Sequence, residues 1–82
     1  MIVERQLPQY VMYNLELQKI SNKAGCYHCC KTFLASEVIR YTDKGKTALC
    51  PLCDIDAVIF DCTGFNLIEE NLQKARKFWF DK

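Results

Sequence analysis

The spacing of apolar residues predicts a helix near the N-terminus. Between Gln9 and Lys23 the apolar residues recur at steps of three and four, which is the spacing of one helical face. They are Tyr10, Tyr13, Leu17, Ile20 and Ala24. Pro8 suits the first helical position, and Gly25 suits a left-handed C-terminal cap. Residues 1–8 have no such period, so we expect an extended arm or an edge strand there.

The middle of the chain has the pattern of a β-hairpin. Val38, Ile39 and Tyr41 favour a strand. Asp-Lys-Gly-Lys at 43–46 is a turn signal, after which residues 47–49 return the chain. We expect this hairpin to bring together the residues on either side of it.

The run 54–60 after the hairpin is short and rich in β-branched residues, so two structures fit it. One is a helix capped by Asp54, and the other is a buried strand. We favour the helix.

The last third of the sequence predicts a second amphipathic helix. Asn66 to Glu69 has the form of a capping box, with the acceptor first and the glutamate three positions later. Acidic residues near its start and basic residues near its end match the helix dipole. One face carries Ile68, Leu72, Ala75 and Trp79.

Cysteine spacing gives the strongest indication of chemistry. The chain has six cysteines, which are Cys26, Cys29, Cys30, Cys50, Cys53 and Cys62. Four of them form two C-x-x-C pairs separated by twenty residues, the arrangement of a structural Cys₄ zinc site. We therefore predict one Zn²⁺ bound by Cys26, Cys29, Cys50 and Cys53, with rubredoxin-type iron and redox-active dithiols as alternatives.

Such a site would dominate the stability of so small a chain. Zinc binding contributes about 10–16 kcal/mol, whereas a small core supplies about 5 kcal/mol or less. We expect metal binding and folding to be one event.

The two spare cysteines and the single histidine have less specific interpretations. Free cysteine usually packs as a small buried hydrophobe, and we expect this of Cys30 and Cys62. Cys30 could exchange with Cys29 as a ligand, and His28 could replace a cysteine, although four well-spaced thiolates make this unnecessary.

Composition and charge narrow the class of protein. The chain has 82 residues, of which 50% are hydrophobic and 26% charged, as in one globular domain spanning 1–82. No stretch approaches the roughly 20 apolar residues of a membrane span, and no secretory signal is recognisable, so we expect a cytoplasmic location. The net charge is +1, and four thiolates with one Zn²⁺ change it to −1, without the basic excess that phosphate binding needs.

Two resemblances bear on the fold. A C-x-x-C knuckle, a hairpin and a second C-x-x-C resemble the treble-clef and zinc-ribbon groups, which implies an α+β domain: a zinc-stapled β-hairpin flanked by N-terminal and C-terminal helices. The chain also resembles a family of small, uncharacterised bacterial cytoplasmic proteins, which implies no activity. The residues concerned are Ala-Gly-Cys-Tyr-His-Cys at 24–29, Ser-Glu-Val-Ile at 36–39, Thr-Ala-Leu-Cys-Pro-Leu-Cys-Asp-Ile-Asp-Ala-Val at 47–58, Gly-Phe at 64–65 and Phe-Trp-Phe at 78–80.

We interpret the chain as a non-enzymatic zinc module that acts through protein contacts, in a format that suits a phage or bacterial accessory or inhibitor protein. Four thiolates leave no open metal position, and neither a phosphate-binding loop nor a nucleophile elbow is present. Phe78 and Phe80 are candidates for a partner contact or for packing on residues 10–17. A symmetric dimer through an apolar helix face stays open.

Two alternative functions remain at this stage. The first is a nucleic-acid-binding zinc ribbon that uses Lys31, Arg40, Lys44 and Lys46 around the hairpin. The second is a thiol-redox or zinc sensor that uses Cys30 or Cys62.

Overall fold

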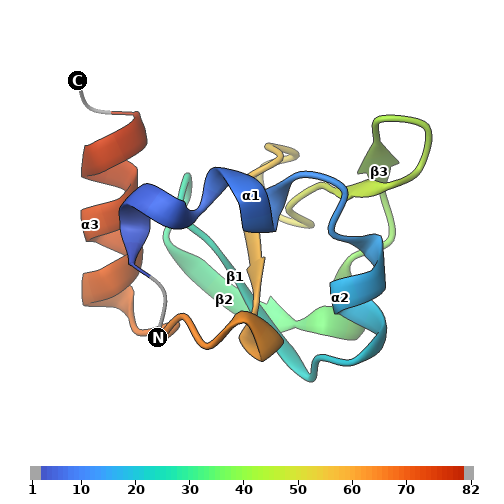
Figure 1. Cartoon of the computed structure of the whole chain (residues 1–82), viewed down its shortest axis with the longest axis horizontal. Coiled ribbons are helices and arrows are strands. Elements are labelled where there is room, and N and C mark those ends of the chain that lie inside the picture. Colours follow the sequence, from blue (N-terminus) through green and yellow to red (C-terminus); the bar gives the residue numbers. More distant parts are fainter. Residues whose placement is uncertain (1–2, 81–82) are drawn as a thin grey trace.

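The computed structural model describes residues 3–80, and Figure 1 shows their arrangement. A three-stranded antiparallel sheet of order β2-β1-β5 lies between helix α3 at one end and a small β3–β4 hairpin at the other. The elements are η1 (Glu4–Gln6), α1 (Pro8–Val11), α2 (Leu15–Lys19), β1 (Lys23–Cys26), β2 (Lys31–Leu34), η2 (Ala35–Glu37), β3 (Tyr41–Thr42), β4 (Thr47–Ala48), β5 (Val58–Phe60), η3 (Asp61–Thr63) and α3 (Glu69–Trp79). None of these helices has the length and apolar character of a membrane span.

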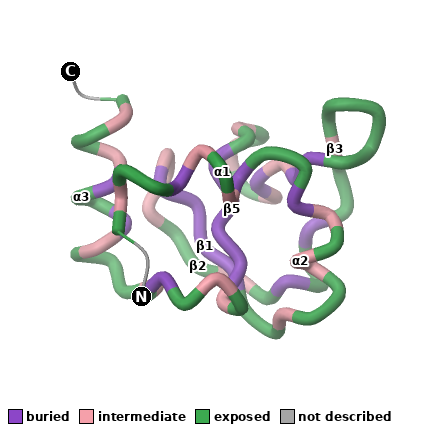
Figure 2. Tube along the Cα trace, viewed as in Figure 1, coloured by how far each residue is buried: buried purple, intermediate pink, exposed green. Residues whose placement is uncertain are grey.

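The central strands form the middle of the hydrophobic core. Figure 2 shows buried residues along β1 and β5, and Val58, Ile59 and Phe60 of β5 are all completely buried. Strand β1 pairs with β2 on one side and with β5 on the other. Because β5 is buried on both faces, its residues are all apolar and do not alternate between apolar and polar as they do in a half-exposed strand.

The predicted N-terminal helix is wrong in its extent. The structure divides 9–23 into two short helices, and Tyr13 between them has φ 54°, which interrupts the helical path. The predicted cap Gly25 lies inside β1 instead. The extended arm is also wrong where it can be compared, because residues 4–6 form a 3-10 helix; residues 1–2 lie outside the described chain. Pro8 does occupy the first turn of α1, as predicted.

The break at Tyr13 is held by long-range hydrogen bonds. The Tyr13 N–H donates to Thr47 Oγ1 at 2.8 Å. The neighbouring Asn14 side chain, only 1% exposed, donates from Nδ2 to the Val58 carbonyl at 3.0 Å and accepts the Ala48 N–H at 2.9 Å. Asn14 thereby links the β3–β4 hairpin to the sheet, and nothing local in the sequence indicates this role.

The predicted hairpin is present but shorter than expected. Strands β3 and β4 pair around the 43–46 turn, where Gly45 has φ 84°. Val38 and Ile39 precede β3 and belong to no strand. The predicted helix over 54–60 is wrong, since residues 58–60 form β5. Pairing with the free side of β1 satisfies the backbone of these residues while it buries their side chains.

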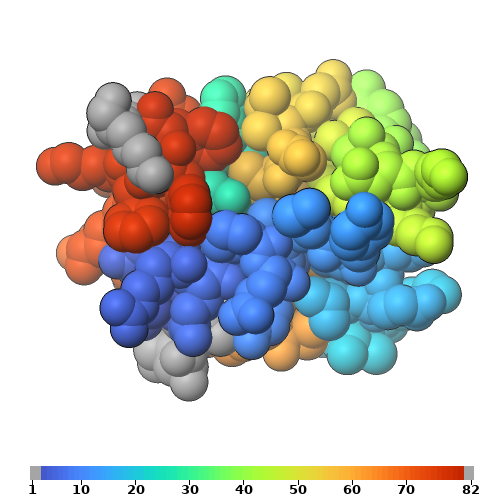
Figure 3. All heavy atoms as spheres, turned by 45° about the horizontal axis from the view of Figure 1, so that its top comes forward, coloured from blue at the N-terminus to red at the C-terminus, as the bar shows by residue number. Residues whose placement is uncertain are grey.

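Helix α3 packs over the sheet and against the N-terminal segment. Gly25 of β1 permits this approach, because a Cβ there would lie 3.2 Å from Leu67 Cδ2 and 3.4 Å from Leu72 Cδ1. Figure 3 shows the N-terminal segment against α3, where Trp79 Nε1 donates to the Glu4 carbonyl at 2.7 Å.

The charge pattern predicted for α3 is confirmed, and so is its predicted face at Leu72, Ala75 and Trp79, but Ile68 precedes the helix and is exposed, and the predicted cap is wrong. Leu72 and Ala75 are buried, and Trp79 is partly buried against the core. The helix begins at Glu69, so the residue preceding it is Ile68, and no side-chain cap bond forms. The Asn66 carbonyl accepts a hydrogen bond from Asn71 Nδ2 instead.

Candidate metal centre

Four cysteine side chains converge at one point between the two C-x-x-C segments. The Sγ atoms of Cys26, Cys29, Cys50 and Cys53 all lie within 4.8 Å of one another. The Cys26–Cys53 and Cys29–Cys50 sulfur pairs are both 3.7 Å apart. A tetrahedral ion with metal–sulfur bonds of about 2.3 Å separates its ligands by about 3.8 Å, whereas a disulfide holds its sulfurs at about 2.05 Å. The donor set therefore fits a single metal ion.

The two C-x-x-C segments, which we call the first knuckle (26–29) and the second knuckle (50–53), have the same backbone design. In the first, the His28 N–H donates to Cys26 Sγ at 3.3 Å. In the second, the Leu52 N–H donates to Cys50 Sγ, also at 3.3 Å. An amide that donates to sulfur stabilises the thiolate form that a metal requires.

The residue after each knuckle closes the turn in a left-handed conformation. The Cys30 N–H donates to the Cys26 carbonyl at 2.8 Å, and the Asp54 N–H donates to the Cys50 carbonyl at 2.9 Å. Cys30 has φ 60° and Asp54 has φ 63°. Glycine is the usual residue in such a conformation, but at the second knuckle the position is occupied by Asp54. The left-handed conformation of Cys30 could have been predicted from its position directly after a C-x-x-C pair.

Strand pairing brings the knuckles together. The first knuckle connects β1 to β2, and the second lies between β4 and β5, which pairs with β1. The Tyr27 N–H inside the first knuckle donates to the Ala57 carbonyl at 3.2 Å, beside the start of β5. Tyr27 is 5% exposed and packs in the core, a role that its sequence position did not reveal.

The ionisation of the thiols depends on their surroundings. Burial raises the pKa of Cys26 far above the ordinary thiol value and raises the pKa of Cys53 to about 11. For Cys50, burial is outweighed by amide hydrogen bonds from Leu52 and Cys53, which lower the pKa of its thiol. In the metal-free chain, Cys26 and Cys53 are therefore protonated at neutral pH.

The end of α3 covers the first knuckle. The Phe80 ring lies 5.5 Å from the Tyr27 ring and 4.9 Å, edge to face, from the His28 ring. Arg76 donates from Nη1 to the His28 carbonyl. These contacts place Phe80 on the first knuckle instead of on the predicted N-terminal helix. The Phe78 ring lies 5.0 Å from that of Trp79, and Phe78 and Phe80 are each 43% exposed.

His28 and the two spare cysteines lie outside the cluster of four sulfurs. His28 Nδ1 is buried and has no hydrogen-bond partner in residues 3–80. Cys30 is partly buried beside the core. The prediction that Cys62 is buried is wrong, since its side chain is exposed, with Sγ 3.6 Å from the Leu17 carbonyl.

The basic residues proposed for nucleic-acid contact are all exposed. Lys31 lies on β2, Arg40 precedes β3, and Lys44 and Lys46 belong to the β3–β4 turn. Arg40 forms an ion pair with Asp54, directly after the second knuckle. The nucleic-acid hypothesis stays a prediction.

Comparison with known proteins finds no family model, no curated protein and no solved structure that matches the chain. The resemblance to small bacterial proteins therefore has no support from these comparisons. The four-cysteine cluster is therefore the feature of the described residues that indicates a function.

Proposed function

We propose that this chain is a non-enzymatic structural-zinc module that acts through protein–protein contacts. The observation that carries the proposal is the convergence of Cys26, Cys29, Cys50 and Cys53 at separations suited to one tetrahedral ion. The ion would join two segments of the chain that lie twenty residues apart in the sequence, which is the task of a structural zinc.

Zinc is favoured over iron on chemical grounds. Four thiolates in a tetrahedral arrangement suit both Zn²⁺ and rubredoxin-type iron, but the general affinity order of divalent metals places Zn²⁺ above Fe²⁺. Zn²⁺ also has no redox chemistry, and its structural sites are closed by four protein ligands.

A closed ligand set supports a structural role without catalysis. Four sulfurs complete the tetrahedron, so no position is left for a metal-bound water or substrate. The single histidine of the chain, His28, has its ring against Phe80. The domain would then function through contacts that its surface makes with a partner protein, as expected for a small zinc-stabilised domain.

The order of elements supports a zinc-ribbon arrangement in preference to a treble clef. Each knuckle is preceded by a strand, and the chain after the second knuckle continues to β5 instead of into a helix. Two similar knuckles on antiparallel strands are typical of a ribbon.

The decisive experiment measures metal and fold together. Chain purified without added metal is analysed by native mass spectrometry and elemental analysis, and folding is followed by near-ultraviolet circular dichroism during titration with a chelator. We expect one Zn²⁺ per chain and loss of the folded signal as the metal leaves. A fully folded metal-free chain, or cysteines found joined as disulfides, would contradict the proposal.

A further inference from the structure

The two knuckles of the candidate metal centre are supported to different degrees. The first knuckle closes the hairpin between β1 and β2, whose pairing continues up to Cys26 on one side and Lys31 on the other. No strand pair of the described residues encloses the second knuckle, because β4 pairs with β3 and β5 pairs with β1. The sheet therefore holds both ends of the first knuckle, whereas the second knuckle lies in a connection between two sheets.

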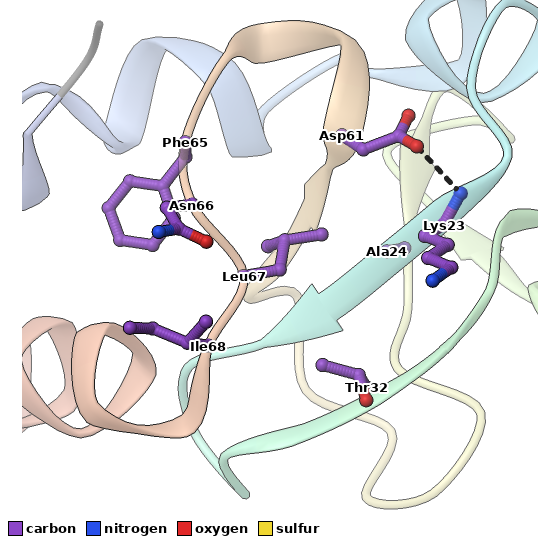
Figure 4. A pocket seen from close by; sticks show the side chains of 8 residues that line it. All are labelled: Lys23, Ala24, Thr32, Asp61, Phe65, Asn66, Leu67 and Ile68. Atoms are coloured by element: carbon purple, nitrogen blue, oxygen red, sulfur yellow. Dashed lines mark hydrogen bonds between the residues drawn. The ribbon is translucent and has the colours of Figure 1, made fainter.

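Strand β1, which leads into the first knuckle, is held along its whole length. At its start, Asp61 Oδ2 accepts the Lys23 N–H at 3.0 Å (Figure 4). Over its middle, the Leu67 side chain lies above Gly25. On its two edges, β2 and β5 pair with it. Cys26 at the end of β1 therefore cannot move without the loss of hydrogen bonds within the sheet.

The end of α3 packs on the tip of the first knuckle. Arg76 donates to the His28 carbonyl, and the Phe80 ring lies 4.9 Å from the His28 ring. Leu52 occupies the equivalent position in the second knuckle, and its side chain is 63% exposed. Cys29 is partly buried and lies between the covered tip and the start of β2. The tip of the first knuckle is thus covered, whereas that of the second knuckle is open to solvent.

The second knuckle is held mainly by hydrogen bonds within its own segment. The Cys50 N–H donates to the Ile55 carbonyl at 3.0 Å, and the Asp54 N–H donates to the Cys50 carbonyl at 2.9 Å. Asp54 also forms an ion pair with Arg40, but both side chains are exposed, so the pair adds little stability. Cys50 is completely buried, whereas Cys53 is only partly buried. Cys53 is therefore the ligand of this knuckle that solvent reaches.

We propose that the second knuckle is the half of the centre that opens, and that Cys53 is the metal ligand at which electrophiles of the α,β-unsaturated carbonyl class modify the zinc-loaded chain. The Cys53 sulfur forms a bond to one carbon of the double bond, and the neighbouring carbon takes a proton from water. The sulfur becomes a thioether and loses the charge that a metal ligand needs, so the modification releases the ion. This inference rests on the proposed function and names a regulation of the same site.

The test treats the zinc-loaded Cys62→Ser chain, which lacks the exposed spare cysteine, with less than one equivalent of N-ethylmaleimide. After denaturation, a heavy-isotope maleimide labels the remaining thiols, and fragment mass spectra give the extent of the first reaction at each cysteine. A zinc-sensitive dye follows metal release. We expect Cys53 to react at least about five times as much as Cys29 and the two buried ligands, with one zinc released for each Cys53 modified.

Removal of the Phe80 ring should expose the first knuckle. In the same Cys62→Ser background, Phe80→Ala should raise the reaction of Cys29 about threefold and leave that of Cys53 unchanged. Phe78→Ala is the matched control, because it removes an equally exposed ring that lies against Trp79, and it should change neither.

Reaction of Cys29 as fast as that of Cys53, modification of Cys53 without zinc release, or no rise at Cys29 in a folded Phe80→Ala chain would overturn the inference. If Phe80→Ala does not fold, the order of reaction in the Cys62→Ser chain decides alone. Zinc content and circular dichroism before labelling report separately on the proposed function. A chain that holds one zinc but reacts first at Cys29 contradicts the opening of the second knuckle, whereas a chain without zinc contradicts both proposals.

Discussion

Cys30 and Asp54 hold the same position after the two knuckles, with φ 60° and 63° and with equivalent amide bonds to Cys26 and Cys50. The chain therefore closes both knuckles without glycine, at a cost of about 1–2 kcal/mol for an ordinary residue in the left-handed region. Aspartate tolerates that region better than most residues do, so the strain is greater at Cys30.

Replacing Cys30 by glycine should relieve this strain. We expect Cys30→Gly to be about 1 kcal/mol more stable than Cys30→Ala, which also lacks the sulfur but keeps the Cβ. Urea denaturation of the zinc-loaded variants measures the difference. Asp54→Gly should gain less over Asp54→Ala, and equal stability of Cys30→Gly and Cys30→Ala would show that the left-handed backbone carries no strain.

Loss of one metal ligand should unfold the chain, whereas loss of a spare cysteine should not. Cys53→Ser removes a sulfur that lies 3.7 Å from Cys26 Sγ, and we expect it to abolish stoichiometric zinc binding and the near-ultraviolet circular dichroism signal. Cys62→Ser, at an exposed cysteine outside the cluster, is the control and should retain both. A folded Cys53→Ser variant would show that the core suffices without the metal.

Zinc affinity should increase with pH. Because burial raises the thiol pKa of Cys26, and that of Cys53 to about 11, both side chains are protonated in the metal-free chain at neutral pH and must lose their protons on binding. Protons therefore compete with the metal, so affinity falls as pH falls and rises towards pH 9. Competition with a chromophoric chelator between pH 6 and pH 9 measures this slope, and a flat profile would contradict protonated ligands.

Removal of the Asn14 carboxamide should be costly. Asn14→Ala leaves the buried Ala48 N–H and Val58 carbonyl without their partners, and each unsatisfied buried group costs about 1–3 kcal/mol. We expect a loss of about 2–4 kcal/mol in urea denaturation. Asn71→Ala, which removes one exposed bond to the Asn66 carbonyl, is the control and should cost less than about 1 kcal/mol. Similar losses for both variants would show that Asn14 does not link the two sheets.

Features that depend on neighbouring residues were predictable from the sequence. The two C-x-x-C pairs predicted that Cys26 and Cys29 would meet Cys50 and Cys53, since two intervening residues let a tight turn direct both sulfurs of a pair to one point. The Asp43–Lys46 turn and the buried face of α3 also follow from local chemistry and from helical period.

Other features were settled by contacts between distant segments. A helix and a strand both fitted residues 54–60, and the free side of β1 decided for the strand. The helical period of apolar residues over 9–23 continues across Tyr13. The helix nevertheless breaks there, because the Tyr13 N–H donates to Thr47, thirty-four residues away, and the Asn14 side chain accepts the Ala48 N–H.

The sequence by itself thus determined the two C-x-x-C pairs, one tight turn and one amphipathic helix, because each of these depends on short spacings that every conformation of the chain shares. The tertiary structure alone decided where the first helix breaks, which way residues 54–60 fold and that Asn14 joins the β3–β4 hairpin to the sheet. The physical reason is that buried backbone groups must find hydrogen-bond partners, and for these segments the partners lie far along the chain.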